Sequence, residues 1–215
     1  MATFFITGTG TDVGKTLVSA IICEALQADY WKPVQAGYEP MTDSEWVKSM
    51  ISNPKTIVHP ESYLLKFPAS PHIAAADEAL EISLEKIVSD KPKTDNHLVI
   101  EGAGGLMVPL NKEEFVCDLI TALDATVIIV SRNQLGSINQ SLLTAMALKQ
   151  KNVKVLGWVF NDEYLDYETE IVGWTGYPWI ASVRQLEHID KGIVHAQSVK
   201  MREHLSVMQH YSWEQ

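Results

Sequence analysis

A glycine-rich segment near the start of the chain carries the residue types that can hold a triphosphate. Residues 4–6 form a short apolar run that predicts a strand, and residues 17–26 predict a helix. Between them lies a glycine-rich loop, residues 8–14, followed directly by Lys15 and Thr16. In this order, the backbone N–H groups of the loop and of the helix start attract an anion. The segment therefore has the layout of a phosphate-binding loop.

The spacing inside this loop favours a nucleoside triphosphate over a dinucleotide. Gly8 and Gly14 are separated by five residues, one more than in the commonest triphosphate loop. Val13 breaks the glycine spacing of dinucleotide loops. Lys15 would supply a point charge for the terminal phosphates, and Thr16 a hydroxyl for Mg²⁺. An ordinary glycine turn between a strand and a helix is the alternative interpretation.

The rest of the chain alternates strand and helix patterns, which predicts the elements that position this loop. The alternation indicates an α/β fold of the P-loop NTPase type, a mostly parallel sheet with helices on both faces. A length of 215 residues suits one domain, residues 1–215. We expect strands at 29–34, 96–101, 125–131, 153–160 and 179–183, helices at 42–50, 72–80, 83–89, 115–123 and 138–151, an irregular stretch at 53–71, and partly helical final residues.

Two charged residues follow predicted strands, where ligands bind in such sheets. Glu101 ends an apolar strand and precedes Gly-Ala-Gly-Gly, so its carboxylate is a candidate Mg²⁺ ligand. The alternative is a solvated glutamate in a glycine turn. Lys32 is held extended by Pro33 and is a candidate to stabilise charge on a transferring phosphoryl group. A surface lysine is the alternative.

Three further positions have both a functional and a plain interpretation. Asp12 places a negative charge inside the phosphate loop, which a partner cation would explain: an amine substrate, Lys15 or the metal. Otherwise it is an exposed loop acid. Asp43 is a metal candidate or, like Thr42, a helix cap. Residues 136–139 begin a helix whose N–H groups could receive a substrate carboxylate, and a plain cap is the alternative.

Composition and charge limit the classes of partner. The formal net charge of −10 argues against broad binding to nucleic acid or to anionic membranes. Two cysteines fit a reducing cytosol, and we expect a cytoplasmic protein. The chain shows neither a signal-peptide pattern nor an apolar run near the roughly 20 residues of a membrane span. We therefore expect small-molecule substrates rather than nucleic acid or membrane as partners.

Six motifs occur together and in order: GTGTDVGKT, KPVQAG, SPHIAA, EGAGGLMVPL, LGSIN and FND. With them the chain resembles dethiobiotin synthetase over residues 4–162, including the extra residue in the phosphate loop. The resemblance implies an ATP- and Mg²⁺-dependent ligase of biotin biosynthesis. Such an enzyme carboxylates 7,8-diaminononanoate with CO₂, activates the carbamate as a carbamic-phosphoric anhydride and closes a cyclic urea.

The resemblance also implies roles for individual residues and a homodimer with its site at the subunit interface. The metal positions are Thr16, Asp43 and Glu101. The catalytic positions are Thr11, Asp12, Lys15 and Lys32. The ATP-binding positions are Gly10, Thr11, Asp12, Val13, Gly14, Lys15, Thr16, Leu17, Glu101 and Asn161. The substrate-binding positions are Lys32 and Ala36, with the neighbouring subunit providing Gly136, Ser137, Ile138 and Asn139.

One departure from the family pattern lies beside the substrate positions. Ala36 stands where the family usually has Ser or Thr, so a hydroxyl near the carbamate is missing. Gln35 is the nearest replacement, but alternation along an extended stretch points neighbouring side chains to opposite sides. We therefore expect a water in the place of the hydroxyl. After Val183 the chain gives no match, and base preference is not predicted.

Two other functions fit a phosphate-binding loop on this fold. A ParA/MinD-like switch ATPase would bind partners instead of a small substrate, but such proteins usually carry a second lysine early in the loop, where this chain has Thr9 and Gly10. A cobyrinate-type ligase needs a glutamine-hydrolysing domain with a nucleophilic cysteine, for which we find no Cys-His pair. ATP turnover that depends on a diamine separates the ligase from the switch.

Overall fold

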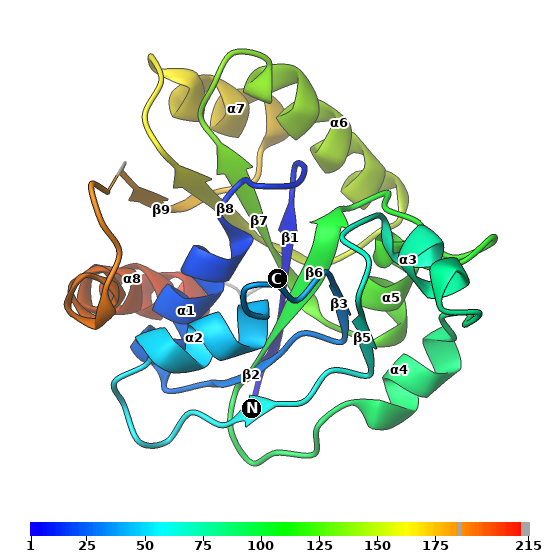
Figure 1. Ribbon diagram of the computed structural model, residues 1–215. Coiled ribbons are helices and arrows are strands. Elements are labelled where there is room, and N and C mark those ends of the chain that lie inside the picture. The colour runs from blue at the N-terminus through cyan, green and yellow to red at the C-terminus, as the bar shows by residue number, and fades with distance from the viewer. Residues whose placement is uncertain (185, 212–215) are drawn as a thin grey trace.

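A sheet of seven parallel strands runs through the computed structural model, which describes residues 1–184 and 186–211. Each neighbouring pair in this sheet is parallel, as the alternation of strands and helices predicts. The strand order is β4 (Val58–His59), β2 (Asp29–Trp31), β6 (Leu98–Gly105), β1 (Thr3–Gly8), β7 (Thr126–Arg132), β8 (Val155–Asn161) and β9 (Trp179–Val183), and Figure 1 labels the strands from β2 to β9 in this order.

Helices cover both faces of the sheet because its strands are apolar on both sides. In β1, Phe5 packs into one apolar cluster, while Phe4 and Ile6 pack into another on the opposite face. The face of Phe4 and Ile6 is covered by α1 (Lys15–Leu26), α2 (Asp43–Met50) and α8 (Lys191–Tyr211). The face of Phe5 is covered by α4 (Leu84–Asp90), α5 (Val116–Ala122), α6 (Ser137–Gln150) and α7 (Tyr167–Thr175).

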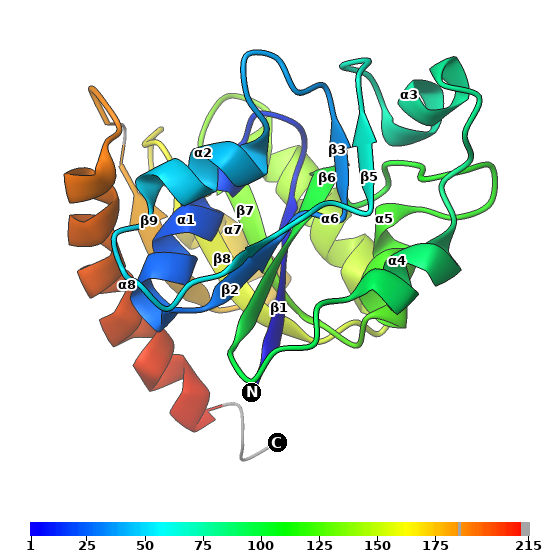
Figure 2. The ribbon, with the colours of Figure 1, turned by 60° about the horizontal axis from the view of Figure 1, so that its bottom comes forward.

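A second, two-stranded sheet stands beside the main one. It pairs β3 (Val34–Ala36) with β5 (Tyr63–Leu65) in parallel and packs against α3 (Pro71–Asp77), as Figure 2 shows. The prediction of one strand over residues 29–34 is therefore wrong. The chain leaves the main sheet at Pro33, which has no N–H for the ladder.

Two further differences from the predicted elements concern short or weakly patterned segments. Residues 53–71 contain β4 and β5 instead of being irregular throughout. These strands have two and three residues, too few to show an alternating pattern. Helix α7 was not predicted, because its sequence has no clear apolar stripe and contains Gly173. The other predicted helices and strands are confirmed to within a few residues of their ends.

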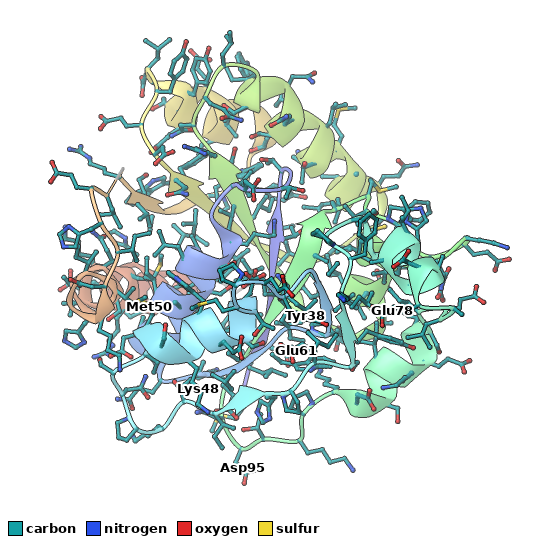
Figure 3. All side chains as sticks on the ribbon, viewed as in Figure 1. Tyr38, Lys48, Met50, Glu61, Glu78 and Asp95 are labelled. Carbon is teal, nitrogen blue, oxygen red and sulfur yellow. The ribbon has the colours of Figure 1, made fainter. Side chains whose placement is uncertain are left out.

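The surface of the molecule carries many charged side chains. Lys48, Glu78 and Asp95 are examples, and Figure 3 labels them. Within residues 1–184 and 186–211, every helix is too short or too polar to cross a membrane.

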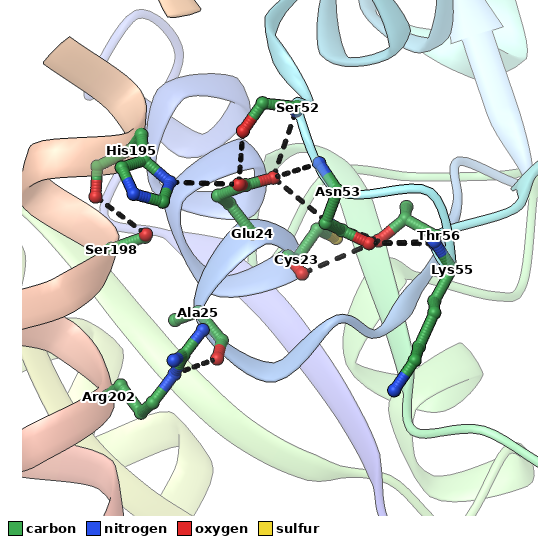
Figure 4. A network of polar contacts seen from close by, with 10 residues as sticks. All are labelled: Cys23, Glu24, Ala25, Ser52, Asn53, Lys55, Thr56, His195, Ser198 and Arg202. Carbon is green, nitrogen blue, oxygen red and sulfur yellow. Dashed lines mark hydrogen bonds and ion pairs between the residues drawn. The ribbon is translucent and has the colours of Figure 1, made fainter. Parts of the chain in front are cut away.

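A buried carboxylate joins α8 to the helix that follows the phosphate loop. Glu24, on α1, is 3% exposed and accepts hydrogen bonds from the backbone and side chains of Ser52 and Asn53, as Figure 4 shows. His195 of α8 contacts the same carboxylate at 3.1 Å, and Arg202 donates to the Ala25 carbonyl. Burial opposes ionisation of Glu24, but these hydrogen bonds outweigh it and lower its pKa to about 2.

Glu24→Gln is expected to lower the free energy of unfolding by about 1–3 kcal/mol at neutral pH, because the charged acceptor of several hydrogen bonds is lost. A depressed pKa stabilises the fold above the ordinary value of 4.5, and this contribution is lost as the pH falls toward about 2. The difference between wild type and variant should therefore shrink over that range in denaturant titrations. Glu203→Gln, at an exposed glutamate of α8, is the control; a constant difference at every pH would contradict the prediction.

Candidate nucleotide and metal site

A pocket of about 760 Å³ opens at the edge where β1 and β6 end. Because parallel strands end on the same side, the loops that follow them meet there. The pocket brings together most of the residues selected from the sequence. Those that line it are Thr11, Asp12, Gly14, Lys15, Thr16, Lys32, Ala36, Asp43 and Glu101.

The phosphate-binding loop has the geometry expected of a glycine loop at a helix start. Gly14 lies in the left-handed region with φ of 95°, and a Cβ there would come within 2.1 Å of the Asn161 amide nitrogen. That amide donates to the Val13 carbonyl at 3.1 Å, so Asn161 lies against the loop. Lys15 is buried and donates to the Gly10 carbonyl at 3.0 Å. Its ammonium is therefore held inside the loop.

A buried carboxylate and a buried lysine face this loop across the pocket. Oε1 of Glu101 accepts hydrogen bonds from the Thr16 hydroxyl at 2.9 Å and from Lys32 Nζ at 3.1 Å. Lys32 also pairs with Asp43. Burial lowers the pKa of Lys32, but the charges of Glu101 and Asp43 outweigh it and raise the pKa above its ordinary value. Lys32 is thus a fixed cation, and the surface-lysine interpretation is wrong.

The start of α2 decides between the two interpretations of Asp43. Thr42 is the N-cap residue: its hydroxyl accepts from the Glu45 N–H at 3.0 Å, and Glu45 accepts from the Thr42 N–H at 2.8 Å. Asp43 is the first helical residue, and its side chain contacts Lys32. The suggestion that Asp43 caps the helix is therefore wrong, and its carboxylate faces the pocket.

One contact in this cluster was not predicted from the sequence. The Tyr30 hydroxyl donates to Oε2 of Glu101 at 2.8 Å, and Tyr30 is completely buried in β2. Burial and the Glu101 charge raise the pKa of Tyr30 well above its ordinary value. Tyr30 lies in a predicted strand with an apolar pattern, so the sequence carries no signal that distinguishes it from a core aromatic residue.

The side-chain oxygens near Lys32 are of the kinds that bind Mg²⁺ when phosphate oxygens provide some of the other ligands. Mg²⁺ prefers a few protein oxygens, with water and substrate oxygens completing its shell. Thr16, Asp43 and Glu101 supply one hydroxyl and two carboxylates within one pocket. Among the residues that the structure describes, no group of three His, Cys, Asp or Glu side chains could hold a metal without such help. This donor set therefore fits Mg²⁺ bound together with a triphosphate.

Some predicted residues lie outside this pocket. The side chains of Val13 and Leu17 belong to the apolar core beneath α1, so only their backbone faces the loop. Gly10, within the loop, and Asn161, beside it, do not line the cavity. Residues 136–139, at the start of α6, do not line it either.

Gln35 differs from the expectation based on strand alternation. We expected it to point away from the side of Ala36, but both residues line the pocket. The amide nitrogen of Gln35 donates to the Gly37 carbonyl at 2.6 Å, and its oxygen accepts from the Asp43 N–H at 3.3 Å. Ala36 is the last residue of β3, and the chain turns at Gly37, which has φ of 76°. Gln35 therefore links this turn to the start of α2.

Comparisons with known proteins identify relatives of this chain. A family model described as an AAA domain matches residues 2–192. The dethiobiotin synthetase of Cytophaga hutchinsonii is 51% identical over 94% of this chain and 97% of its own. That of Christiangramia forsetii is 43% identical over the same shares.

Among solved structures, the septum site-determining protein MinD of Pyrococcus horikoshii, complexed with Mg-ADP, is similar with a TM-score of 0.63 and 14% identity. The similarity covers 95% of each chain and shows the P-loop NTPase-like fold alone. The sequence relatives are far closer. With its phosphate loop, its facing lysine and its two carboxylates, the chain belongs to the ATP-dependent dethiobiotin synthetase family.

Proposed function

We propose that this protein is an ATP-dependent dethiobiotin synthetase, a ligase that converts 7,8-diaminononanoate and CO₂ to dethiobiotin. The observation that carries the proposal is the pair of buried lysines, Lys15 and Lys32, in one pocket with two carboxylates. That arrangement supplies cations for phosphate and carboxylates for a metal ion. The 51% identity to a dethiobiotin synthetase over 94% of the chain supports the choice of substrate. We treat residues 1–215 as one catalytic domain.

The proposed reaction has three steps. One amine of the substrate adds CO₂ and loses a proton, which gives a carbamate. A carbamate oxygen then attacks the γ-phosphorus of ATP, and ADP leaves. The second amine attacks the carbonyl carbon of the resulting mixed anhydride, phosphate leaves, and the cyclic urea forms.

The residues of the pocket have distinct parts in this scheme. Lys15 and Lys32 neutralise charge on the transferring phosphoryl group. Asp12 and Thr11 lie at the exposed side of the pocket, where an ammonium group of the diamine can be held. Ala36 lies on the wall of the same pocket, and we propose that it borders the carbamate. Asn161, which lies against the loop, is the proposed contact for the base.

Magnesium is the proposed metal cofactor. Thr16, Asp43 and Glu101 would hold it, and the ion would neutralise negative charge on the phosphates. A MinD structure with a similar fold was solved with Mg-ADP, which supports a metal-nucleotide complex on this fold. The same similarity keeps a switch ATPase as the second candidate, although it rests on 14% identity.

We propose that the active enzyme is a homodimer whose site includes residues 136–139 of the neighbouring subunit. Asn139, Leu143 and Met146 follow one another at helical spacing and share one face of α6. Leu143 and Met146 are 59% and 65% exposed, and Leu135 just before the helix is 80% exposed. An apolar surface beside the predicted substrate-binding segment supports an interface there.

We also propose a cytoplasmic location. Both cysteines are free and buried, which fits a reducing compartment.

Release of phosphate from ATP is expected to require both the diamine and bicarbonate, and Lys15→Ala should lower this turnover by about 10²–10³-fold. The physical reason is the loss of the cation that neutralises the transferring group. Lys48→Ala, at an exposed lysine of α2, is the matched control and should keep full activity. Phosphate release that ignores the diamine would favour the switch ATPase instead.

Binding of ATP is expected to weaken above about pH 8. Burial lowers the pKa of Lys15 to about 8, and bound phosphates favour its protonated form. Binding above that pH therefore takes up a proton, and affinity should fall by up to about tenfold per pH unit. Lys15→Arg keeps its charge throughout this range and should show a flatter profile. Calorimetric titrations with Mg-ATP test this; equal slopes for the two proteins would refute it.

A shared site is expected to allow two inactive variants to complement each other. Lys15→Ala damages the phosphate side, and Asn139→Asp repels the substrate carboxylate while remaining favourable in the first turn of α6. In a dimer with two-fold symmetry, mixing the two variants after reversible dissociation should restore roughly a quarter of wild-type activity. Gln140→Glu, the next residue along the helix, is the charge-matched control. Absence of any recovery in verified mixed dimers would rule out the shared site.

A further inference from the structure

The Glu101 carboxylate is held from two sides, and only one of them faces the pocket. Oε1 accepts from Thr16 at 2.9 Å and from Lys32 at 3.1 Å, and both donors line the pocket. Oε2 accepts from the Tyr30 hydroxyl at 2.8 Å. Tyr30 is completely buried and does not line the pocket. The phenol therefore contacts the carboxylate from behind.

The pairing of β2 with β6 explains how Tyr30 reaches Glu101. Tyr30 lies beside Val99 in the parallel ladder, and Glu101 is two residues farther along β6. Residues two apart in a strand point to the same face, so Glu101 and Val99 both face α1, which carries Thr16. The long side chain of Tyr30 spans the remaining distance along this face. A shorter hydroxyl residue in β2 would not reach.

This contact fixes the rotation of the carboxylate. Glu101 is 1% exposed, so neither of its oxygens can rely on bulk water for a partner. With Tyr30 holding Oε2, Oε1 stays turned toward Thr16 and Lys32. Without the phenol, Oε2 would be a buried unpaired acceptor, and the carboxylate would gain by turning to share the remaining donors.

We propose that Tyr30 is a positioning residue that keeps Oε1 of Glu101 directed at the cation site beside the phosphate loop. The inference rests on the proposed magnesium site. Tyr30 touches neither the pocket nor, by this placement, the substrate, and it acts through Glu101 alone. Partners of this kind behind a metal ligand typically change metal affinity by 10- to 100-fold, in round terms.

The experiment measures binding of Mn²⁺, a spectroscopic substitute for Mg²⁺, to the full-length protein saturated with ADP. Electron paramagnetic resonance gives the free and bound Mn²⁺ in the wild type, Tyr30→Phe, Glu101→Gln and the double variant. We expect Tyr30→Phe to weaken Mn²⁺ binding about 10-fold or more. The affinity of Tyr30→Phe for ADP in the absence of metal should differ from that of the wild type by less than about twofold, because the phenol contacts no residue of the loop itself.

Tyr63→Phe is the matched control. The Tyr63 hydroxyl accepts a hydrogen bond from the Ser83 N–H at 2.9 Å, away from the pocket. This variant also loses one phenol contact, but its Mn²⁺ affinity should equal that of the wild type. If both Phe variants weaken Mn²⁺ equally, the effect is a general loosening of the fold, and the inference is wrong.

The double variant separates this inference from the metal site itself. If Tyr30 acts through Glu101, Tyr30→Phe should have no further effect in the Glu101→Gln background. An additional 10-fold loss there, or unchanged affinity in Tyr30→Phe alone, would overturn the role of Tyr30. If Glu101→Gln itself leaves Mn²⁺ affinity unchanged, the proposed metal site fails and the inference falls with it.

A structural measurement decides the case if Tyr30→Phe does not fold. A crystal structure of the wild type with ADP and Mg²⁺ should show the phenol still on Oε2 and the metal on the side of Oε1. A phenol turned away from Glu101 in that complex would overturn the inference.

Discussion

The site depends on one constraint: the buried carboxylate of Glu101 needs hydrogen-bond donors for both of its oxygens. Burying a carboxylate costs several kcal/mol unless charges and hydrogen bonds compensate for it. Here Thr16 of α1, Tyr30 of β2 and Lys32 at the end of that strand all donate to it. Lys32 in turn pairs with Asp43 of α2. The contacts of one acid therefore join β6, α1 and β2 directly and α2 through Lys32, on the buried side of the pocket.

The topology of the sheet makes this arrangement possible. Strand β1 lies between β6 and β7, so the phosphate loop that follows β1 lies next to β6, the strand that carries Glu101. Pro33 then diverts the chain into the second sheet, which supplies Gln35 and Ala36 to the wall of the pocket. Gln35 ties that wall to the N-terminus of α2 and thereby to Asp43. The path of the backbone thus places Gln35, Ala36 and Asp43 at the same pocket.

Charge in the pocket differs from that of the whole molecule. The chain carries a net charge of −10, yet Lys15 and Lys32 are both buried at the place where phosphates would bind. Each is kept in place by nearby oxygen atoms, a loop carbonyl for Lys15 and two carboxylates for Lys32. Farther from the pocket, Glu24 ties α8 to α1, so the C-terminal helix supports the element that begins with the phosphate loop.

The sequence by itself determined the phosphate loop and the α/β class and selected Lys32 and Glu101 as candidates, because these signals lie in short runs that need no distant partner. Only the tertiary structure showed that Asp43 does not cap α2, since Thr42 and Asp43 are both suitable capping residues until Thr42 is seen to accept from the Glu45 N–H. It alone disclosed Tyr30, whose contact spans 71 positions of the chain. Such contacts depend on which strands pair in the sheet, and local sequence patterns do not indicate that pairing.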